Sequence, residues 1–297
     1  MTTHAKIQLK LIIATAFWAL TPIIARLLAD YTAPYALAFG RFLIAACALH
    51  IFIRVQGKSP RLTTRHLIAF AILGFSGICL HSILVFMGVE TTQANRANVI
   101  FATIPIMVAL IDAVFLGRRY RAGAVVGILL GIIGTAVVVS DGVLSSLLGA
   151  IGMGEWLILA SAASWAWYSV AGRTLLTMYS PLEVTYFATL FGTVMLAPFV
   201  ALDWEVVPRL LHDPAALAMI IFLGIVNSAI GFLWYYEAVQ KIGAVTTSAY
   251  INLVPIFGVL LSALILGEVP SPGLLIGGSL VILALVLINR FDRPLQA

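Results

Sequence analysis

The chain has 297 residues, of which 62% are hydrophobic and only 10% are charged, and its mean hydropathy is +1.09. Soluble domains are typically about 45–50% apolar and about 25% charged, so this composition excludes a cytosolic enzyme, a disordered chain and a conventional nucleic-acid binder. A membrane crossing takes about 20 apolar residues of helix, so this length has room for about ten crossings with short loops. The net charge of +5 comes from an excess of lysine and arginine, and in a membrane protein the positions of these residues indicate which loops face the cytoplasm.

Apolar runs separated by short polar, proline or glycine segments follow one another along the whole chain. No signal-peptidase cleavage site follows the first run, so we expect that run to be retained as a helix. Cys47 and Cys79 lie inside apolar runs, without the spacing of a disulfide framework or a metal site. We expect ten transmembrane helices, at residues 9–28, 34–53, 67–89, 94–117, 122–140, 152–174, 182–201, 214–239, 244–266 and 273–290.

The distribution of lysine and arginine predicts the orientation of these helices. If the N-terminus lies in the cytoplasm, 13 of the 17 basic residues fall on the cytoplasmic side, which is the bias that membrane insertion favours. These residues are Lys6, Lys10, Arg54, Lys58, Arg61, Arg65, Arg118, Arg119, Arg121, Arg173, Lys241, Arg290 and Arg293. The sequence therefore predicts both termini inside and an even number of helices.

The two halves of the chain repeat each other. Residues 74–117 align with residues 224–267 without gaps at an offset of 150, and this alignment pairs Pro105 with Pro255. Upstream the offset is 147, which pairs Trp18 with Trp165. The pattern predicts one integral membrane domain made of two five-helix repeats, residues 1–146 and 147–297.

An odd number of helices per repeat places the second repeat upside down relative to the first. The charges agree, since Lys58 corresponds to Glu205 and Arg118 corresponds to Glu268. Inverted repeats are typical of transporters, which bind substrate near the membrane midplane between the repeats. The alternative is a chance duplication in a structural membrane protein.

The strongest motif is the run GVETTQANRANVIFATIPIMVALIDAVFLGR at residues 88–118, with its partner AVQKIGAVTTSAYINLVPIFGVLLSALILGE at residues 238–268. With YALAFGRF at residues 35–42, these runs resemble the ten-helix EamA-type exporters of the drug/metabolite transporter superfamily. The resemblance covers essentially the whole chain. It departs at Arg118, where a glutamate usually follows the glycine. The resemblance implies export of small metabolites across the bacterial inner membrane, without fixing the substrate. Within the family, we expect the chain to be similar to the aromatic amino-acid exporters of the YddG kind.

Polar and aromatic residues at predicted mid-depth define a candidate substrate site, because such groups are costly inside a membrane. His81 shares one helix face with several glycines, and Trp18 and Trp165 lie midway along their helices rather than at an interface, where Trp156 and Trp204 are expected. An aromatic pocket with a few polar groups is the usual form of a small-molecule site. For each residue the alternative is helix packing or a satisfied core group. The candidate substrate-binding residues are Trp18, His81, Asn98, Phe101, Trp165, Tyr168, Asn227, Tyr235, Ser248 and Asn252.

Four further residues need an explanation inside the membrane. Pro105 and Pro255 interrupt the backbone hydrogen bonding of their helices and are predicted to act as paired hinges. Arg41 either attracts a substrate carboxylate or acts structurally, by snorkelling or by capping neighbouring carbonyls, and we favour the structural interpretation. Asp112 is expected to pair with arginines of the cytoplasmic face, and its alternative is a proton-coupling acid.

The sequence as a whole favours a secondary transporter that exports aromatic or other hydrophobic amino acids by alternating access. Its alternatives are an exporter of other drug-like or sugar metabolites and, in a different class, a membrane scaffold without transport. Nucleotide-binding and catalytic motifs, metal-ligand spacing and cofactor patterns are missing from the sequence, so we expect no enzyme, no metal, no cofactor and no nucleic-acid partner. The expected partners are the lipid bilayer and a small-molecule substrate, and the prediction is compatible with a monomer.

Overall fold

A computed structural model describes residues 3–28, 31, 33–57, 62–92, 97, 100–140, 152–266 and 272–291. All regular elements in these ranges are helical, as predicted. In the first half the helices are α1 (Thr3–Leu27), α2 (Pro34–Val55), η2 (Thr64–His66), α3 (Leu67–Gly74), η3 (Phe75–Leu80), α4 (His81–Thr91), α6 (Ile104–Leu116) and α7 (Ala122–Ser140). In the second half they are α8 (Met153–Leu175), α9 (Pro181–Leu196), η5 (Ala197–Asp203), α10 (Val207–His212), α11 (Pro214–Phe222), η6 (Leu223–Ile230), α12 (Gly231–Ile242), α13 (Ala244–Ala249), η7 (Tyr250–Asn252), α14 (Leu253–Leu266) and α15 (Pro272–Phe291).

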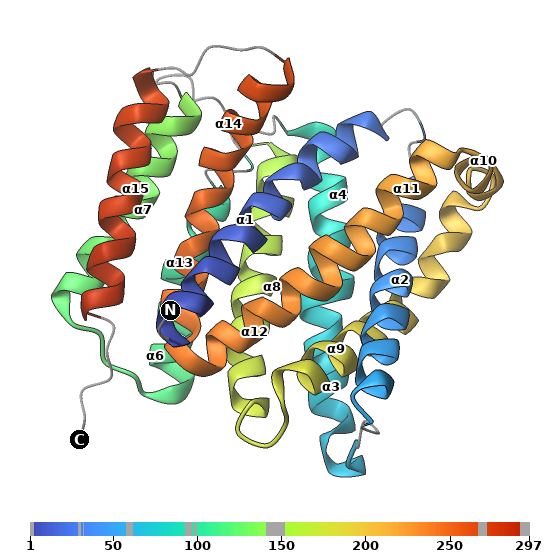
Figure 1. Cartoon of the computed structure of the whole chain (residues 1–297), viewed down its shortest axis with the longest axis horizontal. Helices are drawn as coiled ribbons and strands as arrows, with labels where there is room; N and C mark the ends of the chain where they lie inside the picture. The colour runs from blue at the N-terminus through green and yellow to red at the C-terminus, as the bar shows by residue number, and fades with distance from the viewer. Residues whose placement is uncertain are drawn as a thin grey trace.

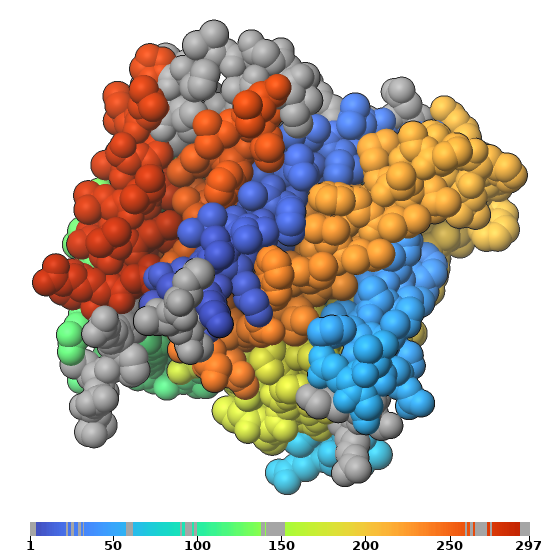
Figure 2. Space-filling model, in the orientation of Figure 1, coloured from blue at the N-terminus to red at the C-terminus, as the bar shows by residue number. Residues whose placement is uncertain are grey.

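The helices run mainly between two opposite edges of the molecule (Figure 1). The α8–α9 turn and the start of α3 lie at the lower edge, whereas α10, the end of α14 and the start of α15 lie toward the upper edge. The lower edge carries segments that the charge bias predicts to be cytoplasmic. Figure 2 shows α1 in blue and the α11–α12 stretch in orange crossing one face side by side, with α15 at the left margin.

The outer surfaces of the helices are apolar, as a membrane requires. Val55, Ile68, Val114 and Leu264 are each more than 70% exposed, and a soluble monomer rarely exposes many such side chains together. Among the described residues, four helical stretches are long and apolar enough to cross a membrane: Pro34–Val55, Thr64–Val89, Pro181–Asp203 and Pro214–Ile242. Shorter apolar helices lie at Ile104–Leu116, Ala122–Val137, Ala244–Gly258 and Leu275–Phe291.

Close helix crossings depend on glycine. A Cβ added at Gly74 would lie 2.6 Å from the Ala188 oxygen and from the Gly192 nitrogen, so α3 and α9 approach backbone to backbone. The α7–α15 pair is equally tight, since a Cβ at Gly134 would lie 2.8 Å from the Gly277 oxygen. Lipid removes most of the hydrophobic drive between helices, so small residues that allow van der Waals contact stabilise the bundle instead.

Two predicted spans contain a wide π-helical turn, which sequence periodicity did not predict. These turns are η3, between α3 and α4, and η6, between α11 and α12, and they overlap at the 150-residue offset of the sequence repeat. In η6 the Ser228 hydroxyl donates to the Leu223 carbonyl oxygen, five residues back, at 2.8 Å, so a side chain occupies the widened backbone. Such turns often lie at functional sites, where they change the direction of side chains.

Side-chain carboxylates cap two helices at the upper edge of the bundle. Asp203 accepts hydrogen bonds from the backbone N–H groups of Tyr35 (2.7 Å) and Ala36 (2.8 Å), in the first turn of α2. Asp213 caps α11 by accepting from the Ala215 N–H at 2.8 Å, and it also accepts from the Tyr31 hydroxyl at 2.5 Å. The Tyr31 hydrogen bond, with the backbone ones, holds the pKa of Asp213 below its usual range.

Candidate functional site

Five aromatic side chains from three helices meet inside the bundle. We call Trp18 of α1, Trp165 and Tyr168 of α8, and Phe232 and Tyr235 of α12 the aromatic cluster. The Trp165 ring centroid lies 5.0 Å from Phe232, 5.2 Å from Tyr168, 5.3 Å from Tyr235 and 5.8 Å from Trp18. Most of these pairs are edge-to-face or tilted, which are the favourable geometries for aromatic rings. The structure therefore brings four predicted site residues together and adds Phe232.

Glycine at one position makes room for this cluster. Gly77 lies in η3, and a Cβ built on it would lie 2.0 Å from Cδ2 of Tyr168. The ring therefore occupies space that any other residue at position 77 would fill.

Asn227 fixes the position of Trp18. The Trp18 indole N–H donates to the Asn227 carbonyl oxygen at 3.0 Å, and the Asn227 amide donates back to Phe17 O (3.1 Å) and Thr21 Oγ1 (2.7 Å). These three bonds tie α1 to η6. Asn227 was predicted to bind substrate, and the structure uses its amide to hold the adjoining helix.

His81 connects the first half of the chain to the aromatic cluster. Its ring centroid lies 4.9 Å from Trp165 and 6.3 Å from Phe101. Its Nδ1 lies 2.8 Å from Ser161 Oγ on α8 and 3.2 Å from the Ser161 carbonyl oxygen. Nδ1 is therefore held by Ser161, whereas Nε2 has no hydrogen-bond partner within the described part of the chain.

Two polar groups in the cluster have no ordinary hydrogen bond to a described residue: the Trp165 indole N–H and the Tyr168 hydroxyl. The Tyr235 ring packs 5.3 Å from Trp165, and its hydroxyl shares a hydrogen bond with Ser169 Oγ at 2.7 Å, which leaves the phenolic oxygen able to accept a second one. A buried polar group without a partner costs about 1–3 kcal/mol, so nearly all such groups in proteins are paired. Both groups are therefore candidate contacts for a bound molecule.

The remaining predicted site residues lie elsewhere or outside the description. Ser248 is buried on α13, where its hydroxyl donates to the Val245 carbonyl oxygen at 2.9 Å. Asn252 lies against α7, where a Cβ at Gly131 would be 2.4 Å from its side-chain nitrogen. Asn98 lies outside the described residues.

Both predicted hinge prolines lie in the first turn of a helix. Pro105 is the second residue of α6, and Pro255 is the third residue of α14, directly after the tight turn η7. The predicted span 244–266 is thus divided into α13, η7 and α14. The proline nitrogen has no hydrogen to donate, and in the first turn of a helix none is needed.

Arg41 does not snorkel out of the bundle. It is 7% exposed, and its Nε donates to Ser228 Oγ of η6 at 2.8 Å. Its guanidinium carbon lies 4.6 Å from the centroid of the Phe42 ring. The residue is therefore held inside, between α2 and η6.

Asp112 of α6 pairs with Arg118 and Arg173, two of the arginines that the charge bias predicts to be cytoplasmic, so the predicted pairing is confirmed. Its fully buried carboxylate accepts from Arg173 Nη1 at 2.9 and 3.2 Å, from Arg118 Nη1 at 3.4 Å and from the Tyr120 hydroxyl at 2.5 Å. Nearby in the bundle, Lys10 of α1 pairs with Glu237 of α12. The Asp112–Arg173 and Lys10–Glu237 pairs each join a helix of the first half to a helix of the second, whereas Arg118 follows Asp112 within the first half.

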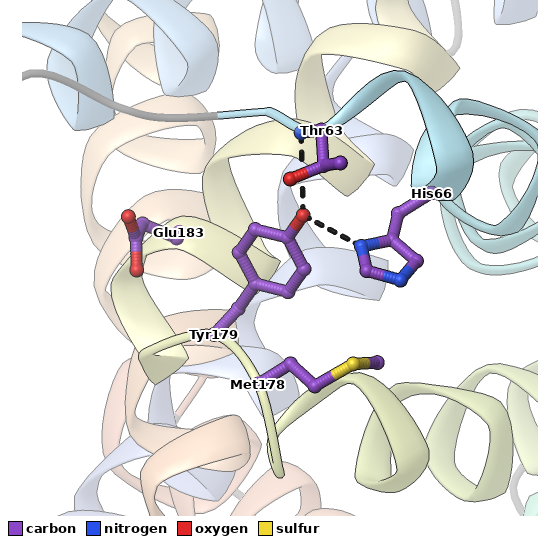
Figure 3. Close-up of a pocket in the computed structure, with 5 residues that line it drawn as sticks. All are labelled: Thr63, His66, Met178, Tyr179 and Glu183. Carbon is purple, nitrogen blue, oxygen red and sulfur yellow. Dashed lines mark hydrogen bonds between the residues drawn. The ribbon is translucent and has the colours of Figure 1, made fainter.

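A pocket of about 270 Å³ opens beside the α8–α9 turn (Figure 3). It is lined by Thr63, His66, Met178, Tyr179 and Glu183. The Tyr179 hydroxyl pairs with His66 Nδ1 at 2.8 Å and accepts from the Thr63 N–H at 3.4 Å. Its residues belong to the lower edge of the bundle, and none of them is a member of the aromatic cluster.

Over the residues that the structure describes, a helical bundle with an apolar outer surface defines an integral membrane protein, and a family match places it in the transporter class. The sequence model of the EamA-like transporter family matches residues 5–140 and again residues 152–290. The chain belongs to this family, which is part of the drug/metabolite transporter superfamily.

Curated relatives and a solved structure agree with this assignment. The chain is 32% identical, over 86% of its length and 83% of the relative's, to a probable terminal-alkyne amino-acid exporter of Streptantibioticus cattleyicolor. It is 28% identical to the uncharacterized transporter YyaM of Bacillus subtilis, over 98% of this chain and 95% of that protein. A crystal structure with 20% identity shares the fold with a TM-score of 0.71, covering 95% of this chain and 96% of the other.

Sequence reasoning missed two residues of the candidate site, Ser161 and Phe232, and left Ser228 as an alternative to Asn227. Ser161 precedes Trp165 by four residues, so it shares the same helix face, and that spacing was an available signal. Phe232 carries no polar atom, so its spacing did not distinguish it from the other apolar residues of its helix. Ser228 could not be separated from Asn227, because the wide turn changes which of the two faces α2.

Proposed function

We propose that this protein exports amino acids with aromatic or other hydrophobic side chains across the bacterial inner membrane. The aromatic cluster is the substrate site, with His81 and Phe101 beside it. The observation that carries this proposal is the unpartnered Trp165 N–H within a wall of aromatic rings, because it offers polar recognition and stacking at one place. The relative named as a probable terminal-alkyne amino-acid exporter supports an amino acid with an apolar side chain.

The proposed mechanism is alternating access between two inverted five-helix repeats. The ion pairs Asp112–Arg173 and Lys10–Glu237 join the two halves at the end of the bundle that the charge bias assigns to the cytoplasm. Opening this end separates the paired helices, and Pro105 and Pro255 are the proposed hinges, since each follows a break in regular helix.

Efflux and counterflow measurements test this proposal. Purified protein in liposomes is loaded with unlabelled L-phenylalanine or L-tryptophan, and the exchange of radiolabelled amino acid is followed against protein-free liposomes. We expect exchange only with protein, and we expect cells that overproduce the protein to survive 4-fluorophenylalanine better than control cells. Equal exchange with and without protein would contradict transport of these substrates. Exchange of sugars but not amino acids would replace the proposed substrate.

A further inference from the structure

Arg41 is a buried cation whose charge the described structure leaves largely unmatched. It lies two helical turns into α2 from Pro34 and is 7% exposed. A guanidinium carries five N–H donors and stays protonated in proteins. Only Nε donates a hydrogen bond, to Ser228, so both terminal amino groups lack hydrogen-bond acceptors among the described residues.

No described carboxylate neutralises this charge. The described acidic groups with cationic partners are Asp112 and Glu237, which pair with other basic residues. The Phe42 ring, 4.6 Å away, compensates the charge only in part, since a cation–π contact is worth about 0.5–2 kcal/mol. A charged side chain inside a membrane protein is expensive and usually marks a functional site.

Arg41 adjoins the aromatic cluster by two routes. Phe42, which lies under the guanidinium, is 5.9 Å from Phe232 of the cluster. Ser228, which holds Nε, follows Asn227, whose carbonyl oxygen accepts the Trp18 N–H. The cation and the aromatic rings therefore belong to one continuous region.

We propose that Arg41 binds the carboxylate of the substrate, with Ser228 orienting the guanidinium and the aromatic cluster receiving the side chain. A guanidinium with free terminal amino groups matches a carboxylate with two parallel hydrogen bonds. The site thereby selects monocarboxylates with an apolar or aromatic side chain over their amides and over amines. This inference rests on the proposed function, since it assigns the aromatic cluster to the substrate.

Matched carboxylate and amide ligands test the inference on the full-length protein. The pairs are L-phenylalanine with L-phenylalaninamide and 3-phenylpropionate with 3-phenylpropionamide. Binding is measured as the ligand-induced rise in melting temperature in detergent, and transport is measured as inhibition of labelled phenylalanine counterflow in liposomes. The variants are Arg41→Gln, Arg41→Lys and Ser228→Ala, and the control is Arg121→Gln, which changes an exposed arginine before α7.

We expect wild type and Arg121→Gln to bind each carboxylate roughly 10- to 100-fold more tightly than its amide, the range typical of hydrogen bonds to charged groups. Arg41→Gln should abolish this preference while the amides bind as before. Arg41→Lys should retain part of it, and Ser228→Ala should reduce it because Nε loses its acceptor. If Arg41→Gln does not fold, the inference is still tested by the carboxylate preference of wild type and by the change in that preference in Arg41→Lys and Ser228→Ala.

An equal response to carboxylate and amide in wild type would overturn the inference, as would an unchanged preference in Arg41→Gln. If Arg41→Gln loses affinity for the carboxylate and for its amide by the same factor, Arg41 acts through packing. This result would also overturn the inference. Binding of the carboxylates without counterflow would contradict the proposed transport and leave the carboxylate anchor supported. If none of the ligands binds, both the carboxylate site at Arg41 and the proposed export of amino acids are contradicted.

Discussion

The carboxylate of Asp112 on α6 lies 2.9 Å from Nη1 of Arg173 on α8, and it is completely buried. The contact joins segments 61 residues apart, one from each half of the chain. Because the arginine side chain is 37% exposed, solvent weakens the pair relative to a fully buried one. It nevertheless connects the two halves that the proposed alternating access would separate.

Asp112→Asn should lower the free energy of unfolding by about 1–3 kcal/mol, because Arg118 and Arg173 then lose their shared anion. The melting temperature in detergent measures the loss. Glu205→Gln, an exposed carboxylate at the opposite edge, is the control and should have little effect. Equal melting temperatures for Asp112→Asn and wild type would show that the pair does not hold the halves together.

Gly77→Ala should destabilise the protein by about 1–3 kcal/mol, the usual cost of forcing an extra methyl group into a packed interior. The new Cβ would meet the Tyr168 ring at 2.0 Å, so ring and backbone would have to move. Gly258→Ala is the matched control, since nothing lies within 4 Å of its added Cβ and alanine favours helix. Thermal melting should therefore separate the two variants, and equal melting would contradict the described packing of η3 on α8.

Asp203→Ala should cost about 0.5–2 kcal/mol, the typical effect of losing a helix N-cap. Two N–H groups of α2 would then lack their acceptor, at Tyr35 and Ala36. Asp203→Asn should retain part of the stability because its side-chain oxygen still accepts. Melting curves of both variants are compared with Glu205→Ala two residues away, and the order expected from lowest to highest stability is Asp203→Ala, Asp203→Asn, Glu205→Ala.

Trp165→Ala and His81→Ala should each reduce amino-acid efflux by roughly tenfold or more, which corresponds to losing about 1.4 kcal/mol of substrate interaction. Trp204→Ala should leave efflux unchanged, because that tryptophan is 68% exposed and lies outside the cluster. Efflux is compared at equal membrane abundance. Wild-type rates in all three variants would show that the aromatic cluster is not the substrate site.

Trp165→Phe separates the two contributions of this residue. Phenylalanine keeps a ring for stacking and removes the indole N–H, so a carrier that uses only stacking should retain its affinity. We expect a loss of affinity for L-tryptophan and L-phenylalanine, measured as the half-saturating concentration in counterflow. An unchanged value would mean that the unpartnered N–H does not contact substrate.

The sequence predicted the helices well, because a membrane helix is specified by local information. The predicted span 122–140 coincides with α7, and the predicted span 34–53 lies within α2, residues 34–55. The aromatic residues Trp18, Trp165, Tyr168 and Tyr235 were also recognisable, since helical spacing and predicted depth placed them inside. Their mutual contacts confirm that these four side chains lie together, and their binding of substrate stays a prediction.

Tertiary structure alone decided the rest, because the deciding partners are far apart in sequence. Arg41 was open to a structural or a substrate-binding role from the sequence, and only the bundle places it beside Ser228, 187 residues away, without a described carboxylate. Asn227 turned toward α1 because a wide turn in its own helix shifts the side-chain register, and periodicity assumes a regular helix. Composition and apolar runs thus determined a helical membrane protein. Contacts between side chains that are far apart in sequence determined which polar groups have hydrogen-bond partners among the described residues.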